Sequence, residues 1–210
     1  MDKDCENLIL EKIKGLKHEA FGRTAIKCKY ADREFEIILL TSECAKSIDL
    51  MELLGRWRKE NEHWYLSQFS VSTERTTKWF MEKLIEVPDR LLFMIKISGK
   101  YIGHVGLFRF DFHNLICEID NILRGEKDCP GIMGDAVMGL MDWARSSLKL
   151  KGFTLKVLSD NSRAIKLYKN LGYQEVLRIP LIQVNGKDGL EWTEAQQDYK
   201  KEAGSFACYN

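Results

Sequence analysis

The chain has 210 residues, 45% hydrophobic and 30% charged, so it is long enough to bury one sizeable core. Its 32 basic and 31 acidic side chains leave a net charge of +1, which argues against the strong positive field of nucleic-acid-binding proteins. No apolar run reaches the length of a membrane span or a signal peptide. We therefore expect a cytoplasmic protein that binds neither nucleic acid nor membrane.

The six cysteines and four histidines are scattered along the sequence. The cysteines form no C-x-x-C pair or tight cluster, so we expect most of them to be reduced. The histidines lack the spacing of a zinc site, and we predict no metal. No Gly/Ser-rich or charge-block linker divides the chain. We expect an N-terminal extension over residues 1–34 and a single domain over residues 35–210.

The first part of this domain is predicted to hold one strand and two helices. The strand covers the apolar and β-branched stretch 35–40. The first helix carries apolar residues at helical spacing, and Ser42 or Ser47 caps it. The second helix begins near Thr73 and ends before Pro88, because the residue preceding a proline disfavours helical geometry.

Three short apolar runs follow, and they predict strands at residues 91–97, 101–110 and 115–123. A compact turn at Gly99 suits an antiparallel hairpin between the first two strands. Gly103 and Gly106, inside the second run, indicate a bulge or a close approach of two backbones.

The rest of the chain is predicted to alternate between helices and strands. Apolar residues from Met133 to Ala144 recur on one helix face, and a strand follows at residues 153–158. A second helix over residues 162–171 ends at Gly172 in a left-handed conformation, before a last strand at 173–184. Together the elements predict a mixed α/β structure in layers.

The first candidate for chemistry is the glycine-containing segment that enters the helix after the third run. Gly131 and Gly134 let the backbone turn tightly, and the unpaired N–H groups of the helix start attract an anion such as a pyrophosphate. The competing interpretation is simple punctuation, because a Pro-Gly turn often precedes a helix.

The second candidate is the helix that begins after Asn161 and carries Tyr168 nearly two turns further on. Asn161 is placed to cap this helix. A positioned phenol at Tyr168 can donate a proton to a leaving thiolate. The alternative is a core tyrosine whose hydroxyl is satisfied by a neighbouring group.

These two segments, about 30 residues apart, resemble the GNAT superfamily of acyl-CoA-dependent N-acyltransferases. The most specific part is Asn161-x-x-Ala164-x-x-Leu167-Tyr168 with Leu171-Gly172-Tyr173. The resemblance implies a mostly antiparallel central sheet that is flanked by helices and splayed where the pantetheine arm binds. It also implies direct acyl transfer to an amine, with acetyl-CoA or another short acyl-CoA as donor.

The resemblance assigns roles to particular positions of this chain. Tyr168 becomes the general acid, and Asn161 lies near the pantetheine arm. The backbone groups that contact pantetheine belong to Ile122, Leu123 and Arg124. Those that bind pyrophosphate belong to Gly131, Ile132, Met133, Gly134, Asp135 and Ala136. The chain departs from the family pattern at Asp128, where Arg or Gln is usual, and at Met133, where Gly or Ala is usual, so the pattern does not fix which amide contacts which phosphate oxygen.

An amine acceptor must lose a proton before it attacks, so a base or a water relay is needed near the third strand. Glu118 and Asp120 are two residues apart and share one strand face. In the families that the chain resembles, a Glu near the position of Glu118 often serves. His104, on the neighbouring strand, has the more suitable ordinary pKa of about 6.5. All three remain candidates, beside ordinary structural roles.

An aromatic-rich stretch without clean periodicity is the candidate acceptor site, through His63, Trp64, Tyr65 and Phe69. These rings can stack on a sugar or a base, although aromatic clusters more often serve packing. The chain resembles the branch that contains amino-sugar nucleotide N-acyltransferases and ribosomal-protein N-terminal acetyltransferases. We expect transfer of an acetyl or short hydroxyacyl group to a small-molecule substrate, a dTDP- or UDP-linked amino sugar of surface-polysaccharide (lipopolysaccharide) biosynthesis.

Two other functions and two oligomeric states stay open at this point. The enzyme alternative is acetylation of a protein N-terminus or another small amine. The alternative from a different class is a catalytically silent acyl-CoA-binding domain, against which Tyr168, Glu118 and Asp120 argue. The oligomeric state is expected to be a monomer or a homodimer.

Overall fold

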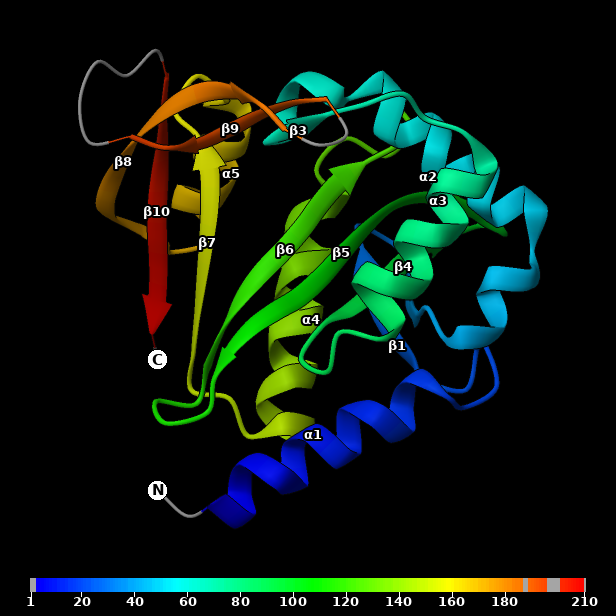
Figure 1. Cartoon of the computed structure of the whole chain (residues 1–210). Coiled ribbons are helices and arrows are strands. Elements are labelled where there is room, and N and C mark those ends of the chain that lie inside the picture. Colours follow the sequence, from blue (N-terminus) through cyan, green and yellow to red (C-terminus); the bar gives the residue numbers. More distant parts are fainter. Residues whose placement is uncertain (1–2, 187–188, 196–200, 210) are drawn as a thin grey trace. The chain divides into compact units, whose positions relative to one another are not determined.

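The computed structural model describes residues 3–186, 189–195 and 201–209 (Figure 1). Contacts between residues divide the chain into two compact units. The first contains the described residues up to Ser47 together with Lys78–Phe153. The second contains Ile48–Thr77 and most of the described residues from Thr154 onward. The predicted boundary between an extension and a single domain at residue 35 stays a prediction.

The first unit contains a run of five antiparallel strands in the order β1-β2-β4-β5-β6. Their bounds are β1 Ala25–Tyr30, β2 Arg33–Leu39, β4 Leu91–Ile97, β5 Lys100–Asp111 and β6 Ile116–Arg124. The three strands predicted from the apolar runs and the hairpin at Gly99 are confirmed. Strand β1 was not predicted, because its side chains alternate between exposed and half-buried and give no apolar run.

Helices pack on this sheet, and Figure 1 shows α4 running behind β5 and β6. The helical segments of the first unit are α1 Lys3–Lys17, η1 Ser42–Lys46, the end of α3, the π-helical turn η3 Met81–Ile85, and α4 Ile132–Leu148. Trp143 of α4 meets Phe93 of β4 edge to face, with ring centroids 5.3 Å apart. Helix α4 buries the apolar face that its spacing predicted.

Lys17 links the end of α1 to the last residues of η3 and to Val87 just after it. Its side chain is 2% exposed, and its Nζ donates to the carbonyl oxygens of Leu84 at 2.9 Å and Ile85 at 3.3 Å, and to that of Val87. Burial lowers the pKa of Lys17 to about 8. The lysine thus supplies donors to carbonyl groups that the end of a helix leaves open.

Strands β5 and β6 approach each other closely at the two glycines, as their positions predicted. A Cβ atom at Gly103 would lie 2.3 Å from the carbonyl oxygen of Leu123. One at Gly106 would lie 2.6 Å from the carbonyl oxygen of Leu91 and 3.3 Å from that of Asp120. The register between the strands shifts from His104 to Gly106, which marks a bulge.

We expect Gly106→Ala to lower the melting temperature, because the new methyl group forces β4 and β6 apart. The cost should be about 1–3 kcal/mol of unfolding free energy, as for other overpacked positions. Gly15→Ala in α1 is the matched control, since a Cβ there meets nothing within 4 Å. The control should stabilise the protein by about 0.5–1 kcal/mol through helix propensity. Thermal and urea denaturation measure both; an unchanged Gly106→Ala protein would contradict the close approach.

The second unit combines helical segments with strands in the order β7-β10-β8-β9-β3. Its elements are α2 Ile48–Glu60, η2 Glu62–Trp64, β3 Ser67–Gln68, the start of α3 Thr73–Phe80, most of β7 Gly152–Leu158, α5 Ser162–Asn170, β8 Gln174–Asn185, β9 Leu190–Glu194 and β10 Lys201–Tyr209. Leu158, Leu181 and Ala203 form a buried cluster against which Trp192 packs. The predicted helices and strand β8 are confirmed, whereas β9 and β10 were not predicted.

The architecture is a mixed α/β fold with mostly antiparallel strands flanked by helices, as the sequence predicted. Gly172 ends α5 with φ 85°, the left-handed conformation expected there. Four cysteines, Cys28, Cys44, Cys117 and Cys129, are free thiols; the side chains of the other two lie outside the description.

Candidate active site

The loop between β6 and α4 is held at both ends by hydrogen bonds. The backbone N–H groups of Gly125 and Glu126 both donate to the carbonyl oxygen of Ile102, at 2.9 and 3.0 Å. At the other end, the Tyr30 hydroxyl donates to the carbonyl oxygen of Pro130 at 2.5 Å. The start of α4 is therefore fixed relative to the sheet of the first unit.

Gly131 is the N-cap of α4 and has φ 104°, a conformation that favours glycine. Because glycine has no side chain, it cannot accept a hydrogen bond from the first N–H groups of the helix. The N–H groups of Ile132 and Gly134 already donate to the carbonyl oxygens of Cys129 at 3.3 Å and Gly131 at 3.0 Å. A phosphate oxygen is suited by the other N–H groups of the first turn and by the positive end of the helix dipole. This geometry fits the predicted diphosphate site.

The neighbouring predicted phosphate-binding residues contribute backbone groups and not side chains. Ile132, Met133 and Ala136 are buried in the core of the first unit. Asp135 places its carboxylate in the first turn of α4, so only its backbone N–H suits an anion. At the departures from the family pattern, Asp128 is exposed and Met133 is 7% exposed.

The residues predicted to contact pantetheine, Ile122, Leu123 and Arg124, lie at the end of β6. Leu123 pairs with His104 and Arg124 with Gly103 on β5, beyond the bulge. Asn121, within the bulge, has φ 49°. The bulge changes which residues of β6 face each side of the sheet, and Ile122 follows directly after it.

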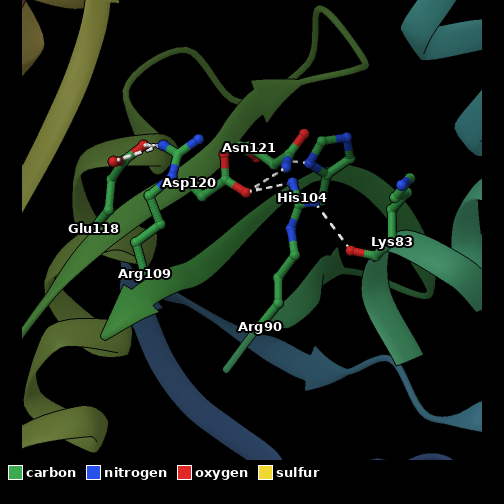
Figure 2. Close-up of polar contacts among 7 residues, drawn as sticks. All are labelled: Lys83, Arg90, His104, Arg109, Glu118, Asp120 and Asn121. Carbon is green, nitrogen blue, oxygen red and sulfur yellow. Dashed lines mark hydrogen bonds and ion pairs between the residues drawn. The ribbon is translucent and has the colours of Figure 1, made fainter. Parts of the chain in front are cut away.

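The carboxylates of Glu118 and Asp120 project from alternate positions of β6, and an arginine holds each of them (Figure 2). Arg109 donates from Nη1 to both carboxylate oxygens of Glu118, each at 2.9 Å. Arg90 donates from Nη2 to Oδ2 of Asp120 at 2.5 Å. Because both carboxylates are engaged in charge-assisted hydrogen bonds, neither is favoured as a base.

His104 lies in the same part of the first unit and is 5% exposed. Its Nδ1 is 2.7 Å from the backbone carbonyl oxygen of Asn121 (Figure 2). A carbonyl oxygen only accepts hydrogen bonds, so Nδ1 carries the hydrogen and the lone pair of the neutral ring lies on Nε2. Of the three candidate bases, His104 has the geometry that suits proton transfer best.

The second unit holds the other two motif residues, Asn161 and Tyr168. Asn161 is the N-cap of α5, and its side-chain oxygen accepts from the backbone N–H of Ala164 at 3.1 Å, as predicted. Tyr168 is 5% exposed, and its ring lies edge-on to that of Tyr173 at 6.2 Å. Burial raises the pKa of Tyr168, so the phenol stays protonated and able to donate at neutral pH.

The aromatic stretch of the second unit is organised around arginines. The Arg58 guanidinium stacks over the rings of Tyr65 at 3.6 Å and Phe69 at 4.9 Å, and donates to the carbonyl oxygen of Ser67. Arg75 lies over the same Phe69 ring at 5.1 Å. Burial lowers the pKa of Arg58. We call these four side chains, Arg58, Tyr65, Phe69 and Arg75, the arginine–aromatic cluster.

His63 and Trp64, the other two predicted acceptor residues, form a separate exposed pair. Their ring centroids are 4.5 Å apart with the planes tilted by 51°. Trp64 is 38% exposed, an unusual position for a large apolar side chain. The pair is therefore available for stacking on a ligand of the second unit.

Sequence reasoning missed Arg90, Arg109, Asn121 and Arg58. Arg90 is 30 positions away from Asp120, so only the strand register brings the two together. Arg58 could have been found from its neighbours in the sequence, because it lies shortly before an aromatic-rich segment. A guanidinium group can stack on such rings. Asn121 could have been suspected of a positive φ, because asparagine tolerates this conformation better than most residues.

The described residues contain neither a candidate metal site nor a candidate membrane-spanning helix. Among these residues no group of three or more His, Cys, Asp or Glu side chains is arranged to hold a metal ion. Nor is any described helix both long enough and apolar enough to cross a membrane.

A model of the acetyltransferase (GNAT) domain family matches residues 40–174 of the sequence. The chain therefore belongs to the GNAT acetyltransferase family. It is an acyl-CoA-dependent N-acyltransferase, and its donor is acetyl-CoA or another short acyl-CoA. No curated protein matches the sequence at a significant level.

Solved structures with the same fold are distant in sequence. The spermidine N-acetyltransferase from Vibrio cholerae, in complex with CoA and spermine, has a TM-score of 0.63 and 14% identity over 83% of this chain and 95% of its own. A probable GNAT-family acetyltransferase from Chromobacterium violaceum has a TM-score of 0.66 and 12% identity, covering 91% and 90%.

RimL, a ribosomal L7/L12 α-N-protein acetyltransferase in complex with CoA, has a TM-score of 0.62 and 16% identity, covering 89% of this chain and 98% of its own. The Vibrio cholerae spermidine enzyme has also been solved as a dodecamer. At these identities the similarities establish the fold.

Proposed function

We propose that this N-acyltransferase transfers an acetyl or short hydroxyacyl group to the amine of a nucleotide-linked amino sugar. The observation that carries the proposal is the arginine–aromatic cluster in the second unit, beside the exposed His63–Trp64 pair. The exposed Trp64 ring suits stacking on a sugar or a base, and guanidinium groups suit a diphosphate. A cytoplasmic location and a monomer or homodimer are part of the proposal.

A second candidate acceptor is a polyamine or a protein N-terminus, which the spermidine enzyme and RimL bring into consideration by their fold. A polycation requires carboxylates with free charge. In the first unit Arg109 and Arg90 pair with Glu118 and Asp120, and in the second unit the aromatic stretch carries arginines. These pairings favour an anionic acceptor over a polycationic one.

The chemistry assigns a proton transfer to each of two side chains. Nε2 of neutral His104 takes one proton from the acceptor ammonium, and the resulting amine attacks the thioester carbonyl carbon. A C–N bond forms and the C–S bond breaks. Tyr168 gives its proton to the leaving thiolate, and the second N–H proton restores the phenol through solvent. One proton is released for each amide formed, so atoms and charges balance.

A panel of acceptors tests the proposal. Purified protein is incubated with acetyl-CoA and either UDP- and dTDP-linked amino sugars, spermidine, or N-terminal peptides, and thiol release is measured. We expect release with the nucleotide sugars. Release with spermidine or peptides alone would replace the amino-sugar proposal with the second candidate, and release with none would favour a silent acyl-CoA-binding domain.

Trp64→Ala should raise KM for the nucleotide sugar about fivefold, because one stacked ring is worth roughly 1 kcal/mol. Trp64→Phe should restore most of the affinity, since it keeps an aromatic face. KM for acetyl-CoA should stay unchanged in both variants. Steady-state kinetics with each substrate varied in turn separate these effects; an acceptor KM that Trp64→Ala leaves unchanged removes this ring from the acceptor site.

A further inference from the structure

We propose that Arg90 is a positioning residue for the base of the reaction, and that it acts through Asp120 and Asn121 on the ring of His104. The inference rests on the proposed acylation of an amine, but it holds for whichever amine is accepted. All four residues belong to the first unit, and Figure 2 shows them in one connected group.

The guanidinium group of Arg90 is held by hydrogen bonds from its N–H groups and by two aromatic rings near its planar faces. Nη1 donates to the carbonyl oxygen of Lys83 at 3.0 Å, and Nη2 donates to Oδ2 of Asp120 at 2.5 Å. The guanidinium carbon lies 4.5 Å from the ring centre of Phe108 and 5.8 Å from that of Trp79. With 15% of its side chain exposed, Arg90 holds the Asp120 carboxylate in one place.

Asp120 in turn holds the bulge of β6. Its Oδ2 accepts a second hydrogen bond, from Nδ2 of Asn121 at 2.7 Å. Asn121 has φ 49°, a conformation that costs energy for a residue with a side chain. The bond to Asp120 offsets part of that cost and fixes the residue where the register of β5 and β6 shifts.

The backbone of Asn121 then determines the state of His104. The carbonyl oxygen accepts from Nδ1 of the ring at 2.7 Å, which leaves the lone pair on Nε2. Two charged groups are connected to this contact through Asn121: the Asp120 carboxylate, on β6, and the Arg90 guanidinium, which precedes β4. Since these charges compensate each other, the basicity of His104 depends on both being present.

Removing either charge should move the pH profile of kcat/KM, and the two removals should move it in opposite directions. Arg90→Met leaves a carboxylate without its cation, which favours the protonated ring and shifts the acidic limb to higher pH, by about half a unit or more. Asp120→Asn leaves an uncompensated cation and shifts the limb to lower pH. We expect kcat at neutral pH to fall about 10-fold in Arg90→Met.

Three comparison variants sharpen the test. Arg90→Lys keeps the charge and should leave the acidic limb within about 0.2 units of wild type, with a smaller loss of kcat. Arg109→Met removes the other arginine–carboxylate pair on β6, at Glu118, and should leave the limb in place. His104→Gln should abolish the limb altogether, because glutamine does not titrate.

The pH profiles are measured with saturating acetyl-CoA and the best acceptor of the wild-type enzyme, and thermal denaturation checks that each variant is folded. Opposite shifts in Arg90→Met and Asp120→Asn support the proposal. An unmoved limb or shifts in the same direction overturn it, as does a shift in Arg109→Met alone, which would assign the base to Glu118. If Arg90→Met does not fold, Arg90→Gln takes its place, and the same shift of the limb to higher pH is expected.

Discussion

Tyr168→Phe is expected to lower kcat by about 10²-fold or more, the usual contribution of a general acid. The substitution removes only the hydroxyl and keeps the ring, which is 5% exposed and lies edge-on to Tyr173. Packing in the second unit should therefore persist. Because burial raises the pKa of Tyr168, the wild-type phenol is protonated at neutral pH, and its loss removes a proton donor.

Steady-state kinetics and calorimetric titration with CoA separate the roles. We expect the dissociation constant of CoA to change less than about threefold in Tyr168→Phe, because the lost group acts on the leaving thiolate. Tyr173→Phe is the matched control: it removes a hydroxyl from the neighbouring buried ring and should keep turnover within a few-fold of wild type. Wild-type turnover in Tyr168→Phe would mean that the tyrosine serves packing alone.

Gly131→Val is expected to weaken CoA binding by about 10- to 100-fold. A Cβ at this position would lie 3.7 Å from the Tyr30 ring, so there is space for it, and the effect comes from the backbone. Valine does not adopt φ 104° without strain of about 1–3 kcal/mol, so the N–H groups at the start of α4 must turn away. That strain corresponds to the expected loss of affinity.

Gly131→Asn serves as the comparison, since asparagine tolerates positive φ better than valine does. It should lose less affinity than Gly131→Val, and both should keep the melting temperature within a few degrees. Isothermal titration with CoA gives the dissociation constants. Equal, wild-type affinity in both variants would place the diphosphate away from this end of α4.

Elements with a buried face on a regular period could be predicted from the sequence, and the others could not. Helix α4 and strands β4 to β6 show their apolar spacing directly. Strand β1 contains no apolar run: Ile26, Cys28 and Tyr30 alternate with lysines and are only half-buried, so the sequence pattern places this segment in the extension. The π-helical turn η3 arises from a bond between Glu86 N–H and the Met81 carbonyl oxygen, and apolar spacing does not reveal which carbonyl a given N–H will choose.

The features of the candidate site that depend on neighbouring residues could also be predicted, and those that depend on distant residues could not. Local chemistry predicted the Asn161 cap and the left-handed Gly172, because both depend on residues within one turn. The role of each carboxylate depends instead on a distant partner. Only after the strands are in register does Arg90 reach Asp120, and only the bulge turns the Asn121 carbonyl toward His104.

The hydrogen bonds from Lys17 of α1 to the end of η3 and to Val87 affect the choice of an N-terminal truncation for expression. A shortened version that starts at the first strand of the predicted domain would lack Lys17, and the carbonyl groups of Leu84, Ile85 and Val87 would lose their donor. That segment leads directly into Arg90. Such an N-terminal deletion would thus weaken the support of Arg90, which positions the proposed base His104. It would do so even though it removes no residue of the GNAT match.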